Sequence, residues 1–140
     1  LPPSPAVAAS NRGHELVMVV EDNDAVRSFV TEALQDAGYR VTSSEGSVPA
    51  LARLTSDLLG FDLLLTDLVM AEMDGYELAR QACAARPSLR VLYMTGYSDN
   101  PKLRQDALST GIDLLEKPFT AAALAAKVRE VLDRPAAPAH

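Results

Sequence analysis

The feature that most limits the fold of this chain is a repeated alternation between short apolar runs and helical patterns, from Leu16 to Arg134. Strands that alternate with helices form βαβ units in a parallel sheet, and right-handed crossovers place helices on both of its faces. The sequence therefore predicts an α/β protein with a doubly wound, five-stranded parallel sheet and five helices. The expected strands are Leu16–Val20, Arg40–Ser43, Leu63–Leu65, Arg90–Met94 and Ile112–Leu115.

Capping residues mark where the expected helices begin and end. Asn23, Ser47 and Thr120 are typical N-caps for the first, second and last helices. Gly38 is expected to follow the first helix as its C′ residue. The third helix is predicted over residues 76–85 and the fourth over residues 98–111. The residues expected on the apolar faces are Val26, Phe29, Val30, Ala33 and Leu34 of the first helix, and Val48, Leu51, Leu54 and Leu58 of the second.

Composition limits the kind of protein. The chain has 140 residues, enough for one domain with a buried core, which we place at 14–134 between a linker, 1–13, and a disordered tail, 135–140. Its formal net charge is −6 and it has no basic cluster, so we expect no nucleic-acid partner. No apolar run approaches the length of a membrane span, so we expect no direct membrane contact.

Two smaller features concern the setting of the chain. It begins at Leu1 rather than Met, so we expect a piece of a longer protein. Its single cysteine, Cys83, has no partner for an internal disulfide and lies in a helical pattern. We therefore expect Cys83 to be a small core or surface residue rather than a nucleophile, and we expect a reducing compartment, the cytoplasm.

Polar residues follow four of the five expected strands. Glu21 and Asp22 follow the first strand, Asp67 the third, Thr95 the fourth and Lys117 the fifth. The carboxyl ends of parallel strands share one edge of a sheet, so these side chains are expected to converge there. Three neighbouring carboxylates repel each other unless a cation neutralises them. A set of oxygen ligands without His or Cys indicates a hard ion such as Mg²⁺.

The same set of residues suits phosphoryl transfer. A carboxylate beside Mg²⁺, here Asp67, can act as a nucleophile toward phosphorus and form an aspartyl phosphate. The Lys117 ammonium and the Thr95 hydroxyl would hold the phosphoryl oxygens that the metal leaves free. Gly96 leaves room for close backbone approach, and we expect a cis Lys117–Pro118 bond.

Each residue also has an ordinary structural interpretation. Glu21 and Asp22 suit the first turn of a helix, where the dipole favours acids, and Asp67 suits a loop. Thr95 suits a hydroxyl that caps a turn, and Lys117 suits a solvated surface position. The occurrence of all of them at strand ends favours the site.

These motifs resemble the receiver domain of two-component response regulators over roughly residues 15–134. The resemblance implies a flavodoxin-like sheet of strand order 2-1-3-4-5. The matching segments are Val19-Val20-Glu21-Asp22-Asn23, Leu65-Thr66-Asp67-Leu68-Val69-Met70, Met73-Asp74-Gly75, Met94-Thr95-Gly96 and Glu116-Lys117-Pro118-Phe119.

The resemblance also implies the roles of the site residues. Asp67 would accept a phosphoryl group from a phosphohistidine of a histidine kinase or a histidine phosphotransfer domain. Mg²⁺ would be bound by Glu21, Asp22, Asp67 and the backbone carbonyl of Val69. The residues that would contact the phosphoryl group and act in the switch are Thr95, Gly96 and Lys117. Phosphorylation would reshape the face of helix four, strand five and helix five, through which we expect contact with a partner or with a second copy in a homodimer.

Three positions concern how this chain departs from the family pattern. Ala71 stands where many members have Pro, and Leu114 stands where many have an aromatic residue three positions before the lysine. In the family, rotation of that aromatic side chain is usually coupled to movement of the residue that corresponds to Thr95. With Leu114 in its place, this coupling is not expected in the usual form. Tyr97 is the residue that we expect to substitute in part, by covering the site.

The amino-acid sequences of two segments indicate the kind of parent protein. The segments 93–98 and 115–120 look similar to receivers at the C-terminus of hybrid sensor histidine kinases, so we expect the parent chain to be a histidine kinase. The alternative within the family is a stand-alone receiver. In either case the domain would be a phosphoacceptor with at most slow self-dephosphorylation.

Other functions fit the residues less well. An aspartyl-nucleophile phosphatase of the haloacid-dehalogenase type needs a second Asp two residues after the nucleophile, and Val69 is there. A nucleotide-binding module needs a Gly-rich loop after the first strand, where this chain has Glu21-Asp22-Asn23. A receiver-like scaffold without phosphorylation is disfavoured because every phosphorylation residue is present.

Overall fold

The predicted parallel sheet is present. The computed structural model describes residues 12–56, 60–96, 105 and 112–134. All strand pairs are parallel, and the strand order is β2-β1-β3-β4-β5, as expected. The elements are β1 (Leu16–Val20), α1 (Asp24–Asp36), β2 (Arg40–Ser44), α2 (Ser47–Ser56), β3 (Leu63–Asp67), α3 (Gly75–Ala85), β4 (Arg90–Thr95), β5 (Leu114–Glu116) and α5 (Ala121–Asp133).

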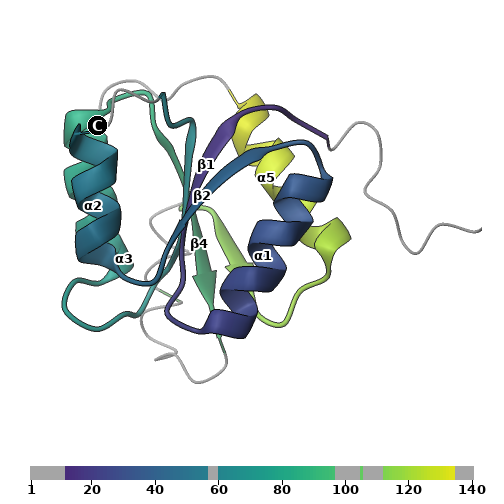
Figure 1. Ribbon diagram of the computed structural model, residues 1–140, viewed down its shortest axis with the longest axis horizontal. Helices are drawn as coiled ribbons and strands as arrows, with labels where there is room; N and C mark the ends of the chain where they lie inside the picture. The colour runs from purple at the N-terminus through teal and green to yellow at the C-terminus, as the bar shows by residue number, and fades with distance from the viewer. Residues whose placement is uncertain (1–11, 57–59, 97–104, 106–111, 135–140) are drawn as a thin grey trace, which may run out of the picture.

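The helices cover both faces of the sheet (Figure 1), with α1 and α5 on one side and α2 and α3 on the other. Four helices lie in the described residues, whereas five were predicted. The predicted fourth helix, 98–111, lies outside the described residues except for Gln105, which is helical. Across the ranges that the structure describes, no helix combines the length and the apolar character needed to cross a bilayer.

Two hydrophobic cores lie on the two sides of the sheet because alternate strand residues point to opposite faces. Val17 and Val19 of β1 face α1 and α5, whereas Met18 and Val20 face α2 and α3. The central strand β3 is buried along its whole length, which explains its nearly continuous apolar run. Because β3 is packed on both faces, its position in the sheet is fixed, and so is the position of Asp67, its last residue.

Two residues predicted to face the core are exposed instead. Phe29 is 42% exposed and Val48 is 49% exposed. Phe29 lies at the edge of the apolar stripe of α1, where its ring contacts that of Phe119 at 6.2 Å between centroids. Val48 is rotated on α2 away from the buried Ala50 and Leu54. Both predictions were wrong because the hydrophobic pattern was assigned to a wider helical face than the sheet covers.

Most of the predicted helix ends are confirmed. The side chains of Asn23 and Thr120 accept hydrogen bonds from the backbone N–H groups of α1 and α5, each at 3.0 Å. Gly38 has φ +100° after α1, as a C′ glycine does. Ser47 was wrongly assigned as a cap, because it is the first residue of α2 itself. The peptide bond between Lys117 and Pro118 is cis, as expected.

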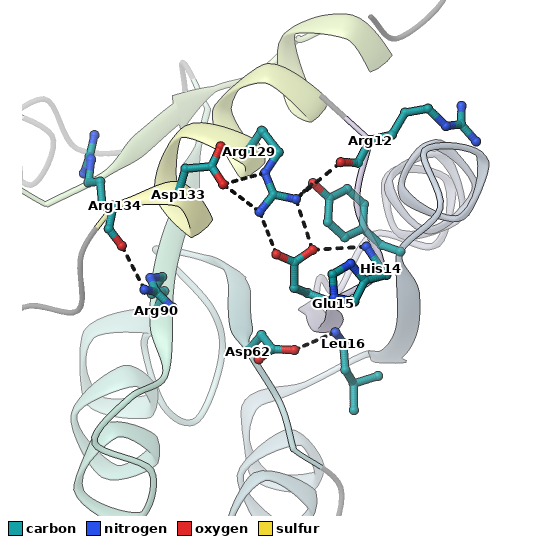
Figure 2. A network of polar contacts seen from close by, with 10 residues as sticks. Arg12, His14, Glu15, Leu16, Asp62, Arg90, Arg129, Asp133 and Arg134 are labelled. Carbon is teal, nitrogen blue, oxygen red and sulfur yellow. Dashed lines mark hydrogen bonds and ion pairs between the residues drawn. The ribbon is translucent and has the colours of Figure 1, made fainter. Parts of the chain in front are cut away.

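A polar network holds the edge of the sheet where the strands begin (Figure 2). The Arg129 guanidinium of α5 donates to both carboxylate oxygens of Glu15, at 3.1 and 2.6 Å. It also donates to Tyr39 Oη at 3.2 Å and to Asp133. The Gly13 N–H donates to the Ala37 carbonyl at 3.0 Å. These contacts fasten the start of the described chain to α5 and to the turn after α1.

Glu72, in the loop between β3 and α3, has φ +69°. A residue with a Cβ atom is strained there by about 1–2 kcal/mol, whereas glycine is not. Glycine also loses about 0.5–1 kcal/mol through its flexibility in the unfolded chain. We therefore expect Glu72→Gly to raise the free energy of unfolding by about 0.5–1 kcal/mol in urea titrations. Glu72→Gln keeps the Cβ atom and serves as the control, and equal stability of the two variants would contradict the prediction.

Candidate functional site

The structure brings the predicted residues together at one edge of the sheet. Glu21 directly follows β1, and Asp67 and Thr95 are the last residues of β3 and β4. All three are buried, with 0%, 5% and 1% of their surface exposed. Lys117 follows β5, and its backbone N–H donates to the Thr95 carbonyl at 2.7 Å. Asp22 is exposed beside this group. The strand order thus gathers residues that are up to 96 positions apart.

Three carboxylates form the centre of this site. Glu21, Asp22 and Asp67 each place an oxygen such that all three oxygens lie within 4.8 Å of one another. Lys117 Nζ lies 2.6 Å from Glu21 Oε1 and 2.8 Å from Asp67 Oδ1. In the protein alone, the ammonium therefore neutralises part of the acidic charge. The donor set consists of carboxylate oxygens only and fits a hard divalent cation.

The two buried carboxyl groups differ in their protonation. Burial, together with the hydrogen bond and charge of Glu21, raises the pKa of Asp67 to about 8, although Lys117 opposes the shift. Burial also acts to raise the pKa of Glu21, but hydrogen bonds with Asp67 and Lys117 outweigh it and lower that pKa. The same two carboxyl groups raise the pKa of Lys117 against the effect of its burial. Near neutral pH the metal-free site therefore holds an ionised Glu21, a protonated Asp67 and a charged Lys117.

This arrangement predicts a pH dependence of stability. In the unfolded chain Asp67 has its ordinary pKa of 3.8, below the folded value of about 8. The folded state therefore binds more protons between these pH values, so stability falls as pH rises from about 4 to 8. Without divalent cations, Asp67→Asn should remove this slope and be more stable than the parent by about 1–3 kcal/mol at pH 8.5.

The measurement is urea unfolding of both proteins at pH 5 and pH 8.5 in chelator. At pH 5 the parent carboxyl is already protonated, so the two proteins should differ little. Addition of Mg²⁺ should stabilise the parent and reduce the difference at pH 8.5, because only the parent has the full acidic set. A difference that is the same at both pH values would contradict the assigned protonation of Asp67.

Neighbouring backbone contacts position Asp67 and the loop after it. The Thr66 hydroxyl donates to the Asp67 carbonyl at 3.0 Å within the core. Gly75 packs against the same carbonyl so closely that a Cβ atom there would lie 2.2 Å from the oxygen. The Asp74 side chain caps α3 by accepting from the Glu77 N–H at 2.9 Å. The Asp-Gly pair was recognised in the sequence as a motif, but the close approach that requires glycine was not.

Arg27 also contributes to the site, and the sequence did not indicate this role. Its guanidinium donates to the Glu21 backbone carbonyl at 2.9 Å and pairs with Asp24. The Asn23 N–H also donates to Glu21 Oε2, at 3.3 Å. These contacts fix the turn that carries Glu21 and Asp22. No sequence signal distinguishes Arg27 from an ordinary exposed arginine one turn into a helix.

The remaining predicted site residues are placed only in part. Val69 lies two residues after Asp67 with an exposed side chain, and the role of its carbonyl stays a prediction. Gly96 directly follows β4 and is half-buried. Leu114 pairs with Tyr93 across the sheet and packs on the core beneath α2 and α3. Tyr97 lies outside the described residues, as does most of the helix-four part of the predicted dimer face.

Comparison with known proteins identifies the class. The chain belongs to the response regulator receiver domain family, whose pattern matches residues 17–129. It is 35% identical over 116 residues to the response regulator receiver protein CpdR of Brucella abortus, covering 83% of this chain and 95% of CpdR. It is also 35% identical over 123 residues to the sensor kinase CckA of the same organism, covering 87% of this chain but only 13% of CckA.

A solved structure supports the fold. A response regulator receiver protein from Sinorhizobium medicae superimposes with a TM-score of 0.74 at 27% identity, covering 86% of this chain and 95% of that one. The flavodoxin-like order of the sheet and the receiver class predicted from the motifs are thereby confirmed. The chain is a receiver domain of two-component signal transduction, related both to a response regulator receiver protein and to a sensor kinase.

Proposed function

We propose that Asp67 is the phosphoacceptor of this receiver and takes its phosphoryl group from a phosphohistidine. The observation that carries the proposal is the position of Asp67 at the end of β3, 2.8 Å from the Lys117 ammonium and within a cluster of three carboxylates. The donor would be a histidine kinase or a histidine phosphotransfer domain. The described residues contain no second cluster of three such ligands that competes for this role.

The reaction follows from the chemistry of the residues. An oxygen of ionised Asp67 attacks phosphorus, the P–N bond of the phosphohistidine breaks, and its electron pair leaves with the imidazole nitrogen. Glu21, Asp22, Asp67 and the Val69 carbonyl would hold Mg²⁺, which when bound would supply positive charge beside the ionised Asp67 carboxylate and the phosphoryl oxygens. Lys117 and the Thr95 hydroxyl each hold another phosphoryl oxygen, and the Gly96 backbone leaves space beside them.

Binding of the phosphoryl group also provides a switch. Lys117 gives up its present contacts with Glu21 and Asp67 in part, because a phosphoryl group carries more charge than the carboxylate. Lys117 is only three residues before Thr120, the cap of α5, so its movement reaches that helix. The protein would then present a changed face of β5 and α5 to a partner or to a second copy. The expected setting is the cytoplasm.

The relatives bear on the parent chain. The relation to the sensor kinase CckA supports a receiver that is part of a histidine kinase, and the nearly complete coverage of CpdR supports a stand-alone receiver. We favour the hybrid kinase because of the segments around Thr95 and Lys117. Expression of the natural full-length product and measurement of its mass would decide between them.

The test of the proposed function is the intact mass after incubation with a small phosphodonor. One phosphoryl adduct is expected with Mg²⁺, and none is expected in chelator or in Asp67→Asn. An Asp22→Asn variant should need more Mg²⁺ for the same yield, because it loses one ligand. An adduct that persists in Asp67→Asn would show that another residue accepts the group. No adduct under any condition would leave two alternatives, a receiver that accepts the group only from its own kinase or a receiver-like scaffold.

A further inference from the structure

A cavity of about 220 Å³ lies beside the proposed phosphorylation site, between the loop that joins β2 to α2 and the loop that joins β3 to α3. Three exposed acids line it, namely Asp22, Glu45 and Glu72. None of its lining residues is basic. Asp22 belongs to the acidic cluster around Asp67, so the cavity opens next to the place where a phosphodonor must approach.

Ser47 provides a second, independent indication of a ligand. It lines the cavity, is only 2% exposed, and its Oγ has no hydrogen-bond partner among the described residues. A buried hydroxyl without a partner is unfavourable, because it has lost its water. Rotation about the Ser47 Cα–Cβ bond would turn this buried hydroxyl toward the cavity, where a donor N–H would offer it a partner. Ser44 does not do so, because its hydroxyl is engaged with the Gly46 backbone.

The start of α2 favours a cation over an anion in this cavity. Helix N-termini attract anions through free N–H groups. Here Pro49, the third residue of the helix, has no N–H, and the Ala50 N–H already donates to the Gly46 carbonyl. Few donors remain at this end of the helix, whereas three carboxylates stand around it. The negative charge of the cavity therefore favours a positively charged ligand.

Exposed apolar side chains around the cavity indicate that its ligand is a side chain of a partner protein. Val48 and Val69, each next in sequence to residues that line the cavity, are 49% and 46% exposed. They are two of only three large hydrophobic residues that are exposed in the described ranges. Exposed apolar groups around a polar pocket are typical of a surface that a partner covers.

We propose that this cavity binds a Lys or Arg side chain of the protein that brings the phosphohistidine, which rests on the proposed function of Asp67. The apolar stem of such a side chain packs on Pro49 and Met70, and its charged head reaches Glu45 and Glu72. Arginine fits best, because its planar fork offers donors to two carboxylates at once and still leaves one for Ser47. The cavity would thus select donors that carry a basic residue near the phosphohistidine.

The binding test uses a minimal probe. The isotope-labelled protein, in saturating Mg²⁺, is titrated with N-acetyl-arginine amide and with the citrulline analogue, which has nearly the same shape without the charge. We expect NMR shifts at Gly46, Ser47 and Glu72, and at least fivefold tighter binding of the arginine probe. Glu45→Gln/Glu72→Gln should abolish the difference, whereas Glu130→Gln, an exposed acid on α5, should preserve it. Equal binding of both probes, or a difference that survives the double substitution, would overturn the proposal.

Phosphotransfer connects the cavity with the partner. A panel of phosphorylated histidine phosphotransfer domains is tested as donors, and the fastest is compared on the parent and on Glu45→Gln/Glu72→Gln. Transfer should slow at least fivefold in the variant, while labelling by a small phosphodonor stays unchanged. Unchanged transfer from the protein donor would overturn the partner assignment. Arginine binding without any phosphoryl adduct would uphold the cationic site and overturn only the role of Asp67.

Discussion

Lys117→Met is expected to lower the free energy of unfolding by about 3 kcal/mol at pH 8 in the absence of divalent cations. The Lys117 ammonium is the group that holds Glu21 and Asp67 together, at 2.6 and 2.8 Å. Glu21 is fully buried and Asp67 is 5% exposed, so water cannot replace the lost charge. Removal of one partner from a buried ion pair costs more than the pair contributes, because a charge is left uncompensated.

The same substitution should also slow phosphorylation. Labelling of Asp67 by a small phosphodonor in Mg²⁺ is expected to fall by about 10²–10³-fold, the usual cost of removing one group that stabilises developing charge. The rate is followed by intact mass over time. Since Mg²⁺ compensates for the acidic charge, it should restore most of the lost stability of Lys117→Met but not the rate. This separation distinguishes a role in phosphoryl transfer from a role in folding alone.

A double substitution provides the control. In the Asp67→Asn background, only Glu21 remains to be paired, so Lys117→Met should cost clearly less stability than in the parent. The difference between the two costs measures the coupling of Lys117 to Asp67. Equal costs in the two backgrounds, or a Lys117→Met protein as stable as the parent at pH 8 without metal, would contradict the assigned contacts.

The residues of this site could be predicted because each stands at the end of an apolar run. A parallel sheet has one edge for all its carboxyl ends, so sequence order alone indicated that Asp67, Thr95 and Lys117 converge. The caps Asn23 and Thr120 were predictable for a related reason, since a cap depends on residues three positions away. Local patterns and a simple topology therefore sufficed for these features.

Features that depend on the distance between side chains were not predictable. Lys117 pairs with Glu21 and Asp67 in the metal-free protein, and the pKa of Asp67 is raised by its burial and by the nearby Glu21, against the effect of Lys117. Both features follow from burial and distance rather than from residue type. The cavity beside Ser47 arises where two loops meet, and neither loop indicates it by its own sequence. The exposure of Phe29 depends on how far the sheet extends beneath α1. In each case the decisive information is three-dimensional.

The largest effect expected away from the site concerns Arg129. Arg129→Met should lower the free energy of unfolding by about 2–3 kcal/mol, because it removes the partner of a half-buried Glu15. The two side chains are only 14% and 17% exposed. The guanidinium also binds Tyr39, as well as the Arg12 carbonyl at the start of the described chain (Figure 2). Urea unfolding at pH 7 measures the loss.

A matched surface substitution separates this network from an ordinary ion pair. Arg80→Met removes an arginine that pairs with Glu77 on the exposed face of α3, with side chains 71% and 40% exposed. Exposed pairs contribute little, so the expected loss is below about 0.5 kcal/mol. Glu15→Gln together with Arg129→Met should lose less than the sum of the single substitutions. A loss for Arg129→Met no greater than that for Arg80→Met would contradict the role of the network.

The stability loss of Arg129→Met should also depend on pH in a characteristic way. The hydrogen bonds from Arg129 lower the pKa of Glu15 from 4.5 to about 2. Its folded pKa lies below the unfolded one, so the stabilisation is complete above about pH 4.5 and is lost as pH falls toward 2. A shift of this size corresponds to about 3 kcal/mol, which partial solvent exposure reduces to about 2. Arg129→Met should therefore be less stable than the parent at pH 6, and this difference should shrink steadily between pH 4.5 and 2. A difference that stays constant over this range would show that Arg129 stabilises the protein by packing rather than through the Glu15 carboxylate.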